Sequence, residues 1–386
     1  MAEIITEAWI LNSGYGNTEP GLLMREEMNL GVLLPDEVLI HPIYGCWEGN
    51  MHHAIMRDPV DICMQRKEDK IVLGNAGVVK VIDTGKNVKD LKPGDVCMLF
   101  CNAISDKYGY PEKILAYDAP NTYGLLSRQS KVSRHTLIPI PPHSGFSLKQ
   151  WAAFSLRYVT AWANWKVALK CWQSQMGDVP VENEFVISWG GGVCLAELEL
   201  AKNYGFNVAM ITSLNERKES LEQAGIITVD RRGFPHLHYD QERYTNDEAY
   251  KKNYRTSEKL FLEKINEITG GAGAAIFIDN IGLSVYRATL KALSRQGVIA
   301  TSGWKWGMEL SHLRAIESIN RHIHVHTHYA KHTEAIEAME YALRNNWMPQ
   351  VDVDYVYEWD EIPRLCSDYA TGNLISYFPL YKINDE

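Results

Sequence analysis

Apolar and polar positions alternate with a short period over the first 150 residues, which is typical of β-strands joined by turns. The run at 36–47 (DEVLIHPIYGCW) is β-rich, and the run at 74–100 (GNAGVVKVIDTGKNVKDLKPGDVCMLF) contains two strand-like segments. Within the second run, Pro93-Gly94-Asp95 has turn chemistry, because proline presets φ and glycine accepts a positive φ. This pattern predicts an N-terminal region made mostly of strands and turns.

Helical spacing of apolar residues begins after Ser147 and continues to about residue 169. The preceding residues, from 136, are extended and rich in proline. Serine is a favoured N-cap, because its hydroxyl accepts a hydrogen bond from the first helical turn. The sequence therefore predicts a helix that starts directly after Ser147.

A regular alternation of buried strands and helices begins near residue 180, and it predicts a doubly wound parallel sheet of the α/β class. The stretch at 233–265 is polar and aromatic, so we expect it to be an insertion that interrupts the alternation. After Val351 the chain returns to short strands and one helix. In the alternating region we expect strands at 185–189, 207–213, 273–282 and 297–303, and helices at 193–204 and 283–295.

The composition adds exclusions to this picture. With 386 residues, 46% hydrophobic and 23% charged, the chain is long enough for two or three globular domains. A net charge of −9 disfavours a general binder of nucleic acid or anionic membranes, because both need a basic face. No apolar run reaches the roughly 18 residues of a membrane span, and the acidic N-terminus lacks a signal-peptide pattern. We expect a cytoplasmic protein.

The seven cysteines are scattered, odd in number and without a C-x-x-C motif. This usage predicts neither a disulfide framework nor a structural zinc site, which needs four soft ligands.

Three glycines, Gly190-Gly191-Gly192, follow a predicted strand and open a predicted helix. In dinucleotide-binding folds such glycines let the backbone approach the pyrophosphate, which then meets the amide groups of the helix N-terminus. The last glycine of the usual motif is replaced here by Cys194 or Leu195, depending on the alignment. A glycine-rich turn of an ordinary α/β protein is the alternative reading.

The end of the next strand discriminates between the two nicotinamide cofactors. An acidic residue there would bind the ribose 2′-hydroxyl of NAD, but the segment 212–218 (TSLNERK) has none at the strand tip. Its hydroxyls and basic pair, with Ser213, Arg217 and Lys218 as the candidates, suit the 2′-phosphate of NADPH. The alternative is an exposed helix start whose charges are solvated.

Several of these motifs together resemble the medium-chain dehydrogenase/reductase superfamily. The resemblance runs over nearly the whole chain and includes the segments at 74–96 and 185–205 and the stretch AFSLRYVTAWANW at 153–165. The polar stretch at 233–265, ILAYDAP at 114–120, Trp189 and THYAKHTEAIEA at 327–338 resemble the crotonyl-CoA carboxylase/reductase subfamily.

The resemblance implies a GroES-like β-barrel catalytic domain at 1–160, a Rossmann domain at 161–330 with its insertion near 233–265, and a return to the catalytic domain at 331–386. It also implies a homodimer or a dimer of dimers, formed through edge strands such as 320–327. The expected function is NADPH-dependent reduction of an α,β-unsaturated thioester, carried by CoA or by an acyl carrier protein, with reductive carboxylation left open.

The sequence departs from the family at positions that carry chemistry. Zinc-dependent members use a cysteine and a Gly-His-Glu motif, and Gly74-Asn75-Ala76 stands in its place, so we expect no metal. Trp47 replaces a tyrosine near the substrate, and Glu48 replaces an asparagine that helps to hold CO2 in the carboxylating subfamily. A carboxylate there would repel a forming carboxylate, which argues against carboxylation.

By the same resemblance, Tyr117 and Asp118 align with a phenylalanine–glutamate pair, and His328 matches a site histidine. His328 and Asp118 are candidates for relaying a proton. His328 also ends an alternating run from His322 that, on one face of a strand, offers imidazoles to a metal as an alternative. The expected cofactor-binding residues are Thr160, Gly190, Gly191, Gly192, Val193, Ser213, Arg217, Lys218, Asn280, Ser302 and Gly303.

Two other functions stay open at this point. One is reduction of a quinone or ketone without zinc on the same fold. The other is a degenerate member that binds a nucleotide or a partner but transfers no hydride, which the replaced tyrosine, asparagine and glycine favour.

Overall fold

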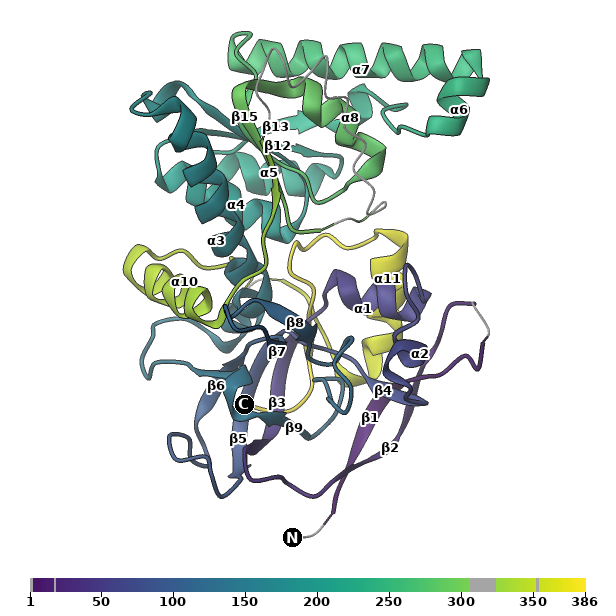
Figure 1. Cartoon of the computed structure of the whole chain (residues 1–386), viewed down its shortest axis with the longest axis vertical. Helices are drawn as coiled ribbons and strands as arrows, with labels where there is room; N and C mark the ends of the chain where they lie inside the picture. Colours follow the sequence, from purple (N-terminus) through teal and green to yellow (C-terminus); the bar gives the residue numbers. More distant parts are fainter. Residues whose placement is uncertain (1–2, 17–18, 304, 306–323, 352–353) are drawn as a thin grey trace. The chain divides into compact units, whose positions relative to one another are not determined.

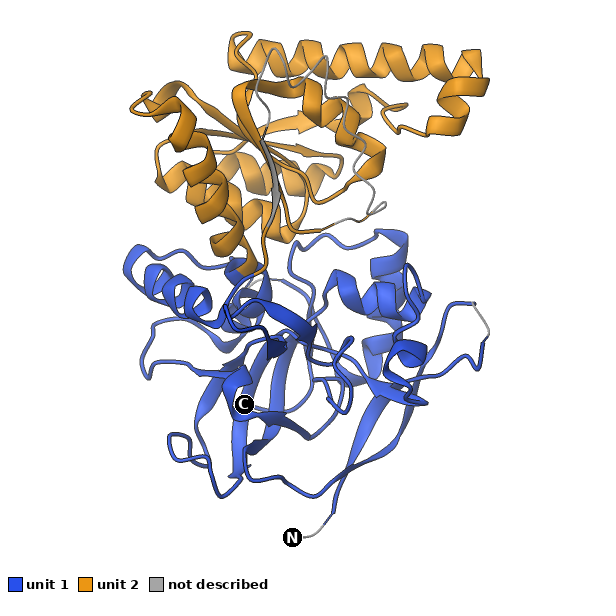
Figure 2. Ribbon diagram, viewed as in Figure 1, with its two compact units in different colours: residues 1–159, 330–386 blue, residues 160–329 orange. Residues whose placement is uncertain are grey.

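The computed structural model describes residues 3–16, 19–303, 305, 324–351 and 354–386, which form two compact units (Figure 2). Unit 1 comprises Met1–Val159 and Ala330–Glu386, and unit 2 comprises Thr160–Tyr329. The chain crosses between the units twice, so unit 1 is built from two separate segments. In the part that the structure describes, no helix is both long and apolar enough to cross a membrane.

Unit 1 is mainly β-structure, arranged as a three-stranded sheet, a larger sheet of seven strands and a two-stranded hairpin (Figure 1). The three-stranded sheet has the order β2-β1-β4, and the larger sheet has the order β10-β6-β5-β3-β18-β17 with β9 paired to β3. The strands are β1 Ile4–Asn12, β2 Leu23–Gly31, β3 Glu37–Cys46, β4 Lys70–Val72, β5 Gly77–Thr84, β6 Val96–Leu99, β7 Asn102–Ser105, β8 Pro111–Ile114, β9 Ser130–Ser133, β10 Leu137–Pro139, β17 Val356–Tyr357 and β18 Leu380–Lys382. The helices are α1 Gly49–Met56, α2 Ile62–Arg66, α10 His332–Asn345 and α11 Ile362–Thr371, with short 3-10 turns at Arg134–Thr136 and Trp359–Glu361.

The C-terminal strand β18 completes the larger sheet by pairing antiparallel to β3, with Leu380 opposite Cys46 and Tyr381 opposite Gly45. The Tyr381 ring packs so closely on this strand that a Cβ atom on Gly45 would lie 2.2 Å from its Cζ atom. Only glycine leaves room for that ring, so the sequence at Gly45 is fixed by a residue near the other end of the chain.

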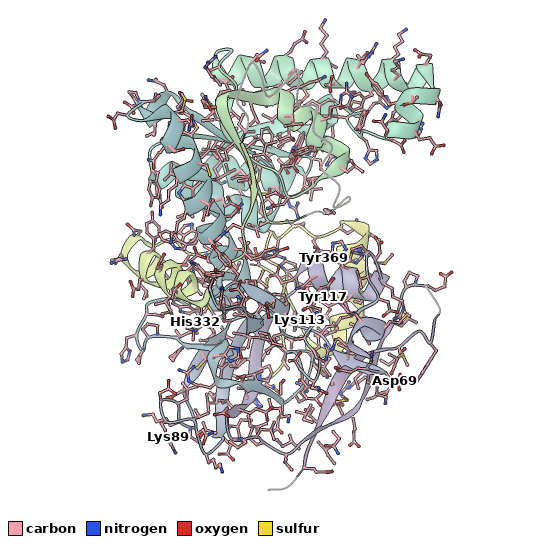
Figure 3. The ribbon with its side chains drawn as sticks, viewed as in Figure 1. Asp69, Lys89, Lys113, Tyr117, His332 and Tyr369 are labelled. Atoms are coloured by element: carbon pink, nitrogen blue, oxygen red, sulfur yellow. The ribbon has the colours of Figure 1, made fainter. Side chains whose placement is uncertain are left out.

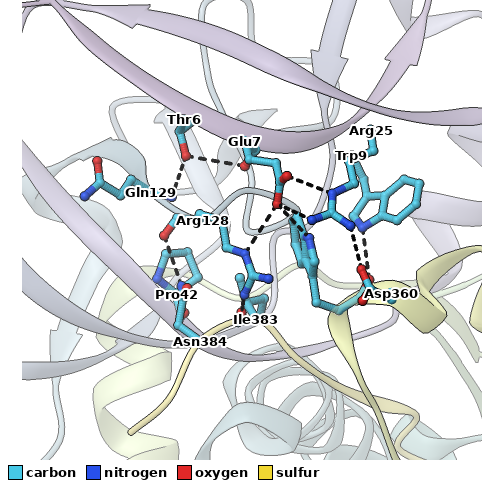
Figure 4. Close-up of polar contacts among 11 residues, drawn as sticks. Thr6, Glu7, Trp9, Arg25, Pro42, Arg128, Gln129, Asp360, Ile383 and Asn384 are labelled. Atoms are coloured by element: carbon cyan, nitrogen blue, oxygen red, sulfur yellow. Dashed lines mark hydrogen bonds and ion pairs between the residues drawn. The ribbon is translucent and has the colours of Figure 1, made fainter.

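A network centred on Glu7 also joins the N-terminal and C-terminal parts of unit 1 (Figure 4). The Glu7 carboxylate lies 2.8 Å from Arg25 Nε, accepts a 3.1 Å hydrogen bond from Trp359 Nε1 and lies 3.6 Å from Arg128 Nε. The hydrogen bond from Arg25 is the largest of the effects that hold the pKa of Glu7 below its ordinary value.

Replacing Glu7 with glutamine is expected to destabilise unit 1 by at most about 1 kcal/mol at neutral pH, since the network is partly exposed. A lowered folded-state pKa contributes stability that is present above the unfolded-state pKa and is lost as the pH falls through the folded-state value. The difference between wild type and Glu7→Gln should therefore shrink on acidification below about pH 4.5, the ordinary glutamate value. Urea unfolding at several pH values measures it. Glu27→Gln, in the strand position opposite Glu7, is the control and should cause no loss.

The long helix α3, Leu148–Met176, runs through the boundary between the units. Gln150 N donates to Ser147 Oγ at 3.2 Å, and Ser147 N donates to Gln150 Oε1 at 3.1 Å. These reciprocal bonds cap the helix start, and they confirm the N-cap predicted at Ser147.

Unit 2 is a six-stranded parallel sheet with the order β13-β12-β11-β14-β15-β16 and helices between the strands. The order runs outward in both directions from the central pair β11 and β14, which is the topological switch point where open α/β sheets bind ligands. The predicted doubly wound parallel sheet is confirmed. The strands are β11 Phe185–Trp189, β12 Asn207–Thr212, β13 Ile227–Asp230, β14 Ala274–Ile278, β15 Leu293–Thr301 and β16 His324–Thr327. The helices are α4 Gly192–Asn203, α5 Asn215–Gln223, α6 Gln241–Asn246, α7 Glu248–Thr269 and α8 Leu283–Ala292, with 3-10 turns at Val181–Asn183 and Arg231–Gly233.

The stretch at 233–265, expected to be an insertion, instead supplies the crossover between β13 and β14. Helix α7 lies within it and extends to Thr269, and Tyr254, Phe261 and Ile265 place one apolar face of α7 in the core of unit 2. Most of the other positions of α7 are polar, and this polarity hid the helix. The helix expected at 283–295 also ends earlier, at Ala292, where the backbone becomes extended and begins β15.

Candidate cofactor and substrate site

The glycine turn lies at the carboxyl end of β11, between Trp189 and the start of α4. Gly191 has φ 151° and ψ 157°, a conformation that favours glycine, and no side chain caps the first turn of α4. A Cβ atom on Gly191 would meet only Cys194 Sγ, at 3.8 Å. The turn therefore has both the open space and the uncapped helix N-terminus, including Gly192 and Val193, that a pyrophosphate group requires.

Asn280 links the ends of three neighbouring elements at this edge of the sheet. Its Oδ1 accepts hydrogen bonds from Ser302 N at 2.7 Å and Ser302 Oγ at 3.2 Å, and its Nδ2 donates to Cys194 Sγ at 3.4 Å. A Cβ atom on Gly303 would lie 3.5 Å from Asn280 Cβ, so Gly303 is a neighbour of this side chain. The structure thus brings together the glycine turn, Asn280, Ser302 and Gly303. From the sequence, Cys194 was identified only as the replacement of a glycine, and its contact with Asn280 is seen in the structure.

The three residues after β12 that are candidates for binding the 2′-phosphate have different surroundings. Ser213 is exposed, and Arg217 lies in the first turns of α5. Lys218 Nζ lies 3.6 Å from a carboxylate oxygen of Asp230, whose closer partner is Arg232 at 2.6 Å. The hydrogen bonds from Arg232 are the largest influence that holds the pKa of Asp230 far below its usual range. The Lys218 charge therefore balances a neighbouring carboxylate.

Two further cations, which the sequence did not indicate, belong to the same edge of the sheet as Arg217. Desolvation is the main cause that lowers the pKa of Lys305, and the charges of Arg217 and Arg231 lower it further, so both guanidinium groups lie near Lys305. The Arg231 guanidinium lies 5.9 Å from the ring centre of Trp189. Arg231 and Lys305 follow other strands than Arg217 does, β13 and β15, so no local pattern placed them in this group.

Two other predicted residues of unit 2 lie outside the Asn280 network. Thr160 is on α3, at the first position of unit 2. His328 directly follows β16, so it lies at the same carboxyl edge of the parallel sheet as Asn280 and Ser302.

In unit 1, Trp47 and Glu48 connect β3 to α1 and are buried. Arg157, on α3, donates from Nε to Glu48 Oε2 at 3.0 Å, from Nη2 to the Trp47 carbonyl at 2.6 Å and from Nη1 to the Tyr377 carbonyl. Burial raises the pKa of Glu48, and the charge of Arg157 opposes that shift. The sequence signal for this ion pair was a single charged residue inside the apolar stretch 153–165.

Tyr117 and Asp118 lie in the loop after the β7–β8 hairpin (Figure 3 labels Tyr117 and Lys113). Asp118 Oδ1 accepts a 2.6 Å hydrogen bond from Ile114 N, and Oδ2 lies 3.5 Å from Lys113 Nζ. The Tyr117 carbonyl accepts a hydrogen bond from Arg66 Nη1 at 3.3 Å. Asp118 thus stabilises its own loop, and the buried Arg66 holds the backbone at Tyr117.

The residues at the position of the zinc motif do not fit a metal. Burial raises the pKa of the Cys46 thiol strongly, which keeps it protonated, and the Arg157 cation is near enough to influence it. Asn75 is buried and stands in the place of a histidine ligand. Among the described residues, no group of three or more His, Cys, Asp or Glu side chains could hold a metal ion. Of the histidine run, His322 lies outside the described residues.

Comparisons with known proteins agree with this architecture. No family model matches the chain. The crotonyl-CoA reductase of Streptomyces collinus is 23% identical over 296 residues, which cover 73% of this chain and 61% of the relative. The chain therefore matches less than two thirds of that relative's length.

Solved structures are similar over almost the whole chain. The crotonyl-CoA carboxylase/reductase AntE in complex with NADP has a TM-score of 0.79 at 19% identity, covering 100% of this chain and 96% of that one. The 2-octenoyl-CoA carboxylase reductase CinF, in complex with NADP and 2-octenoyl-CoA, has a TM-score of 0.78 at 17% identity, covering 98% and 87%. An alcohol dehydrogenase of Aeropyrum pernix has a TM-score of 0.75 at 18% identity, covering 97% and 99%.

These similarities confirm the predicted combination of a GroES-like unit with a Rossmann unit. The chain has the fold of the medium-chain dehydrogenase/reductase superfamily and is similar to its crotonyl-CoA carboxylase/reductases.

Proposed function

We propose that the protein is an NADPH-dependent reductase of α,β-unsaturated acyl-CoA thioesters. The observation that carries this proposal is the carboxyl edge of the unit 2 sheet, where the open glycine turn, the Asn280 network and the cluster of Arg217, Arg231 and Lys305 occur together. The similarity to NADP-bound enoyl-CoA carboxylase/reductases supports both the cofactor and the thioester substrate.

In this proposal the residues of unit 2 bind and orient the cofactor. Gly190, Gly191, Gly192 and Val193 hold the pyrophosphate, and Ser213, Arg217 and Arg231 hold the 2′-phosphate. When bound, NADPH supplies a hydride to the β carbon of the substrate. The α carbon then takes a proton, and we propose His328 as its donor because His328 lies at the same sheet edge.

We further propose that reduction ends with this proton and needs neither zinc nor CO2. The Arg157 cation lies near Cys46, and Asn75 replaces the second metal ligand. By the resemblance, Glu48 takes the place of an asparagine that helps to hold CO2 in the carboxylating subfamily, and a buried carboxylate there disfavours a second negative charge beside it. Nε, Nη1 and Nη2 of Arg157 all donate to protein atoms, so the Arg157 guanidinium already has protein partners and is not set aside for binding CO2.

The test measures NADPH oxidation with crotonyl-CoA and 2-octenoyl-CoA, each with and without bicarbonate, followed by mass analysis of the product. We expect saturated acyl-CoA at the same rate in both conditions. A bicarbonate-dependent product that is heavier by one CO2 would overturn the claim that protonation completes the reaction. NADPH oxidation with quinones alone would favour the quinone reductase alternative, and failure to bind NADPH would favour a non-catalytic role.

A second copy of the chain is the proposed partner in solution. Among the described strands, β16 is the last in the unit 2 sheet, and an edge strand of this kind can pair with the same strand of another copy. Residues 320–323 of the expected edge lie outside the described part of the chain. Light scattering during size-exclusion chromatography distinguishes a dimer from a monomer.

A further inference from the structure

A buried hydrogen-bond chain in unit 2 connects the residues that directly precede the two main cofactor-binding segments. Trp189 precedes the glycine turn, and Asp279 precedes Asn280. Trp189 Nε1 donates to Thr289 Oγ1 at 2.8 Å, and Thr289 Oγ1 donates to Asp279 Oδ2 at 2.8 Å. Thr289, on α8, thus joins the end of β11 to the end of β14.

All three members of this chain are nearly inaccessible to solvent. Trp189 is 1% exposed, Thr289 0% and Asp279 2%. The Trp189 ring is stacked on Phe261, with ring centres 5.2 Å apart and an interplanar angle of 24°. A buried donor or acceptor that loses its partner has no water to replace it, so each bond in this chain restricts where the adjoining backbone can lie.

Asp279 also fixes the turn that presents Asn280. Its Oδ1 accepts hydrogen bonds from Ile281 N and Gly282 N, each at 3.0 Å, which closes the turn before α8. Asn280 is enclosed by this turn, and its side chain reaches Cys194 and Ser302. The position of the Asn280 amide therefore depends on the Asp279 carboxylate.

The glycines after Trp189 lack this kind of restraint. Gly190 and Gly191 have no side chains, and the Gly190 amide makes one backbone hydrogen bond, to the Ile211 carbonyl at 3.1 Å. The anchored Trp189 side chain is thus the nearest fixed point from which the turn departs. The Arg231 guanidinium also lies over the Trp189 ring, 5.9 Å from the ring centre.

We infer that Thr289 and Asp279 are positioning residues of the cofactor site, and that the Trp189–Thr289–Asp279 chain sets the glycine turn and Asn280 in register with each other. Neither residue is required to touch the cofactor. This inference rests on the proposed function, because it assumes that the site binds NADPH.

The test compares Thr289→Val with wild type, since valine keeps the shape of threonine but removes its hydroxyl. We expect the Kd for NADPH, followed by quenching of tryptophan fluorescence, to rise about tenfold or more, with a smaller change in kcat. Hydrogen exchange of the free protein should increase at residues 189–195 and 279–282. Thr289→Ser, which restores the hydroxyl, should return both readouts close to wild type.

Thr269→Val is the matched control at the opposite end of β14. Thr269 Oγ1 donates to the Ile265 carbonyl at 2.8 Å and accepts from Gly273 N at 3.0 Å, so this variant also breaks two buried hydrogen bonds in unit 2. It should lower Tm and leave the Kd for NADPH unchanged. Equal Kd values for wild type and Thr289→Val, with exchange at 189–195 and 279–282 also unchanged, would overturn the inference alone. A wild-type protein that binds no NADPH would overturn the proposed function, and this inference with it.

Discussion

Replacing Arg157 with methionine is expected to lower the free energy of unfolding by about 3–5 kcal/mol at neutral pH, as for other broken buried ion pairs. The variant leaves the Glu48 carboxylate buried without its cation and removes donors from the Trp47 and Tyr377 carbonyls. Urea unfolding followed by tryptophan fluorescence measures the loss. The exposed Arg364, which pairs with Glu361 on the surface, provides the control: Arg364→Met should cause no measurable change.

The loss of unfolding free energy in Arg157→Met should depend on pH. Without Arg157, only burial remains as the main influence on Glu48, and burial raises its folded-state pKa. A raised folded-state pKa gives stability that is present below the unfolded-state value and is lost as the pH rises through the folded-state value. The deficit should therefore be largest near neutral pH and should diminish toward pH 4.5, the ordinary glutamate value. Adding Glu48→Gln should recover part of the loss at neutral pH, and a deficit unaffected by pH and by this second change would contradict the interpretation.

Replacing Gly191 with alanine is expected to weaken NADPH binding by at least about tenfold, which corresponds to roughly 1.4 kcal/mol. The φ of 151° and ψ of 157° at Gly191 lie in a region that other residues occupy only at a cost of about 1–3 kcal/mol. Alanine either strains the turn or shifts it, and its Cβ enters the space that the pyrophosphate requires. Fluorescence titration with NADPH measures the effect.

Gly270→Ala is the matched control for Gly191→Ala. Gly270 also has a positive φ, 61°, and open space around it, but it ends α7 at the amino end of β14. Its replacement should lower stability and leave NADPH affinity unchanged. Equal losses of affinity in both variants would mean that the effect is a general weakening of unit 2.

Local sequence patterns predicted those elements that depend on residues close together in the chain. The N-cap at Ser147 and the turn at Gly190–Gly192 depend on residues within a few positions, and the sequence located both. Helix α7 was missed because its buried residues Tyr254, Phe261 and Ile265 are separated by many charged ones. A period of 3.6 was present there, but the polarity of the stretch outweighed it.

The contacts that organise the candidate site are long-range, and no local pattern contains them. Glu48 and Arg157 are 109 positions apart, and Trp189 and Thr289 are 100 apart. The resemblance to a family suggested that Glu48 matters, and the position at a strand end suggested Asn280, but neither argument provided their partners. Pairing of buried polar groups depends on the packed fold, so Arg157, Thr289 and Cys194 became visible only in the structure.

The pairing of β18 with β3 also imposes an order on the synthesis of the protein. Cys46 leaves the ribosome early, but its strand partner Leu380 follows only after all of unit 2. Unit 2 is contiguous and can fold while unit 1 still lacks its second segment. Until Tyr381 arrives, this part of β3 has an unpaired edge, which is a template for association with other nascent chains. The nascent protein therefore passes through a stage in which unit 2 can be complete while the larger sheet of unit 1 still lacks its C-terminal strands.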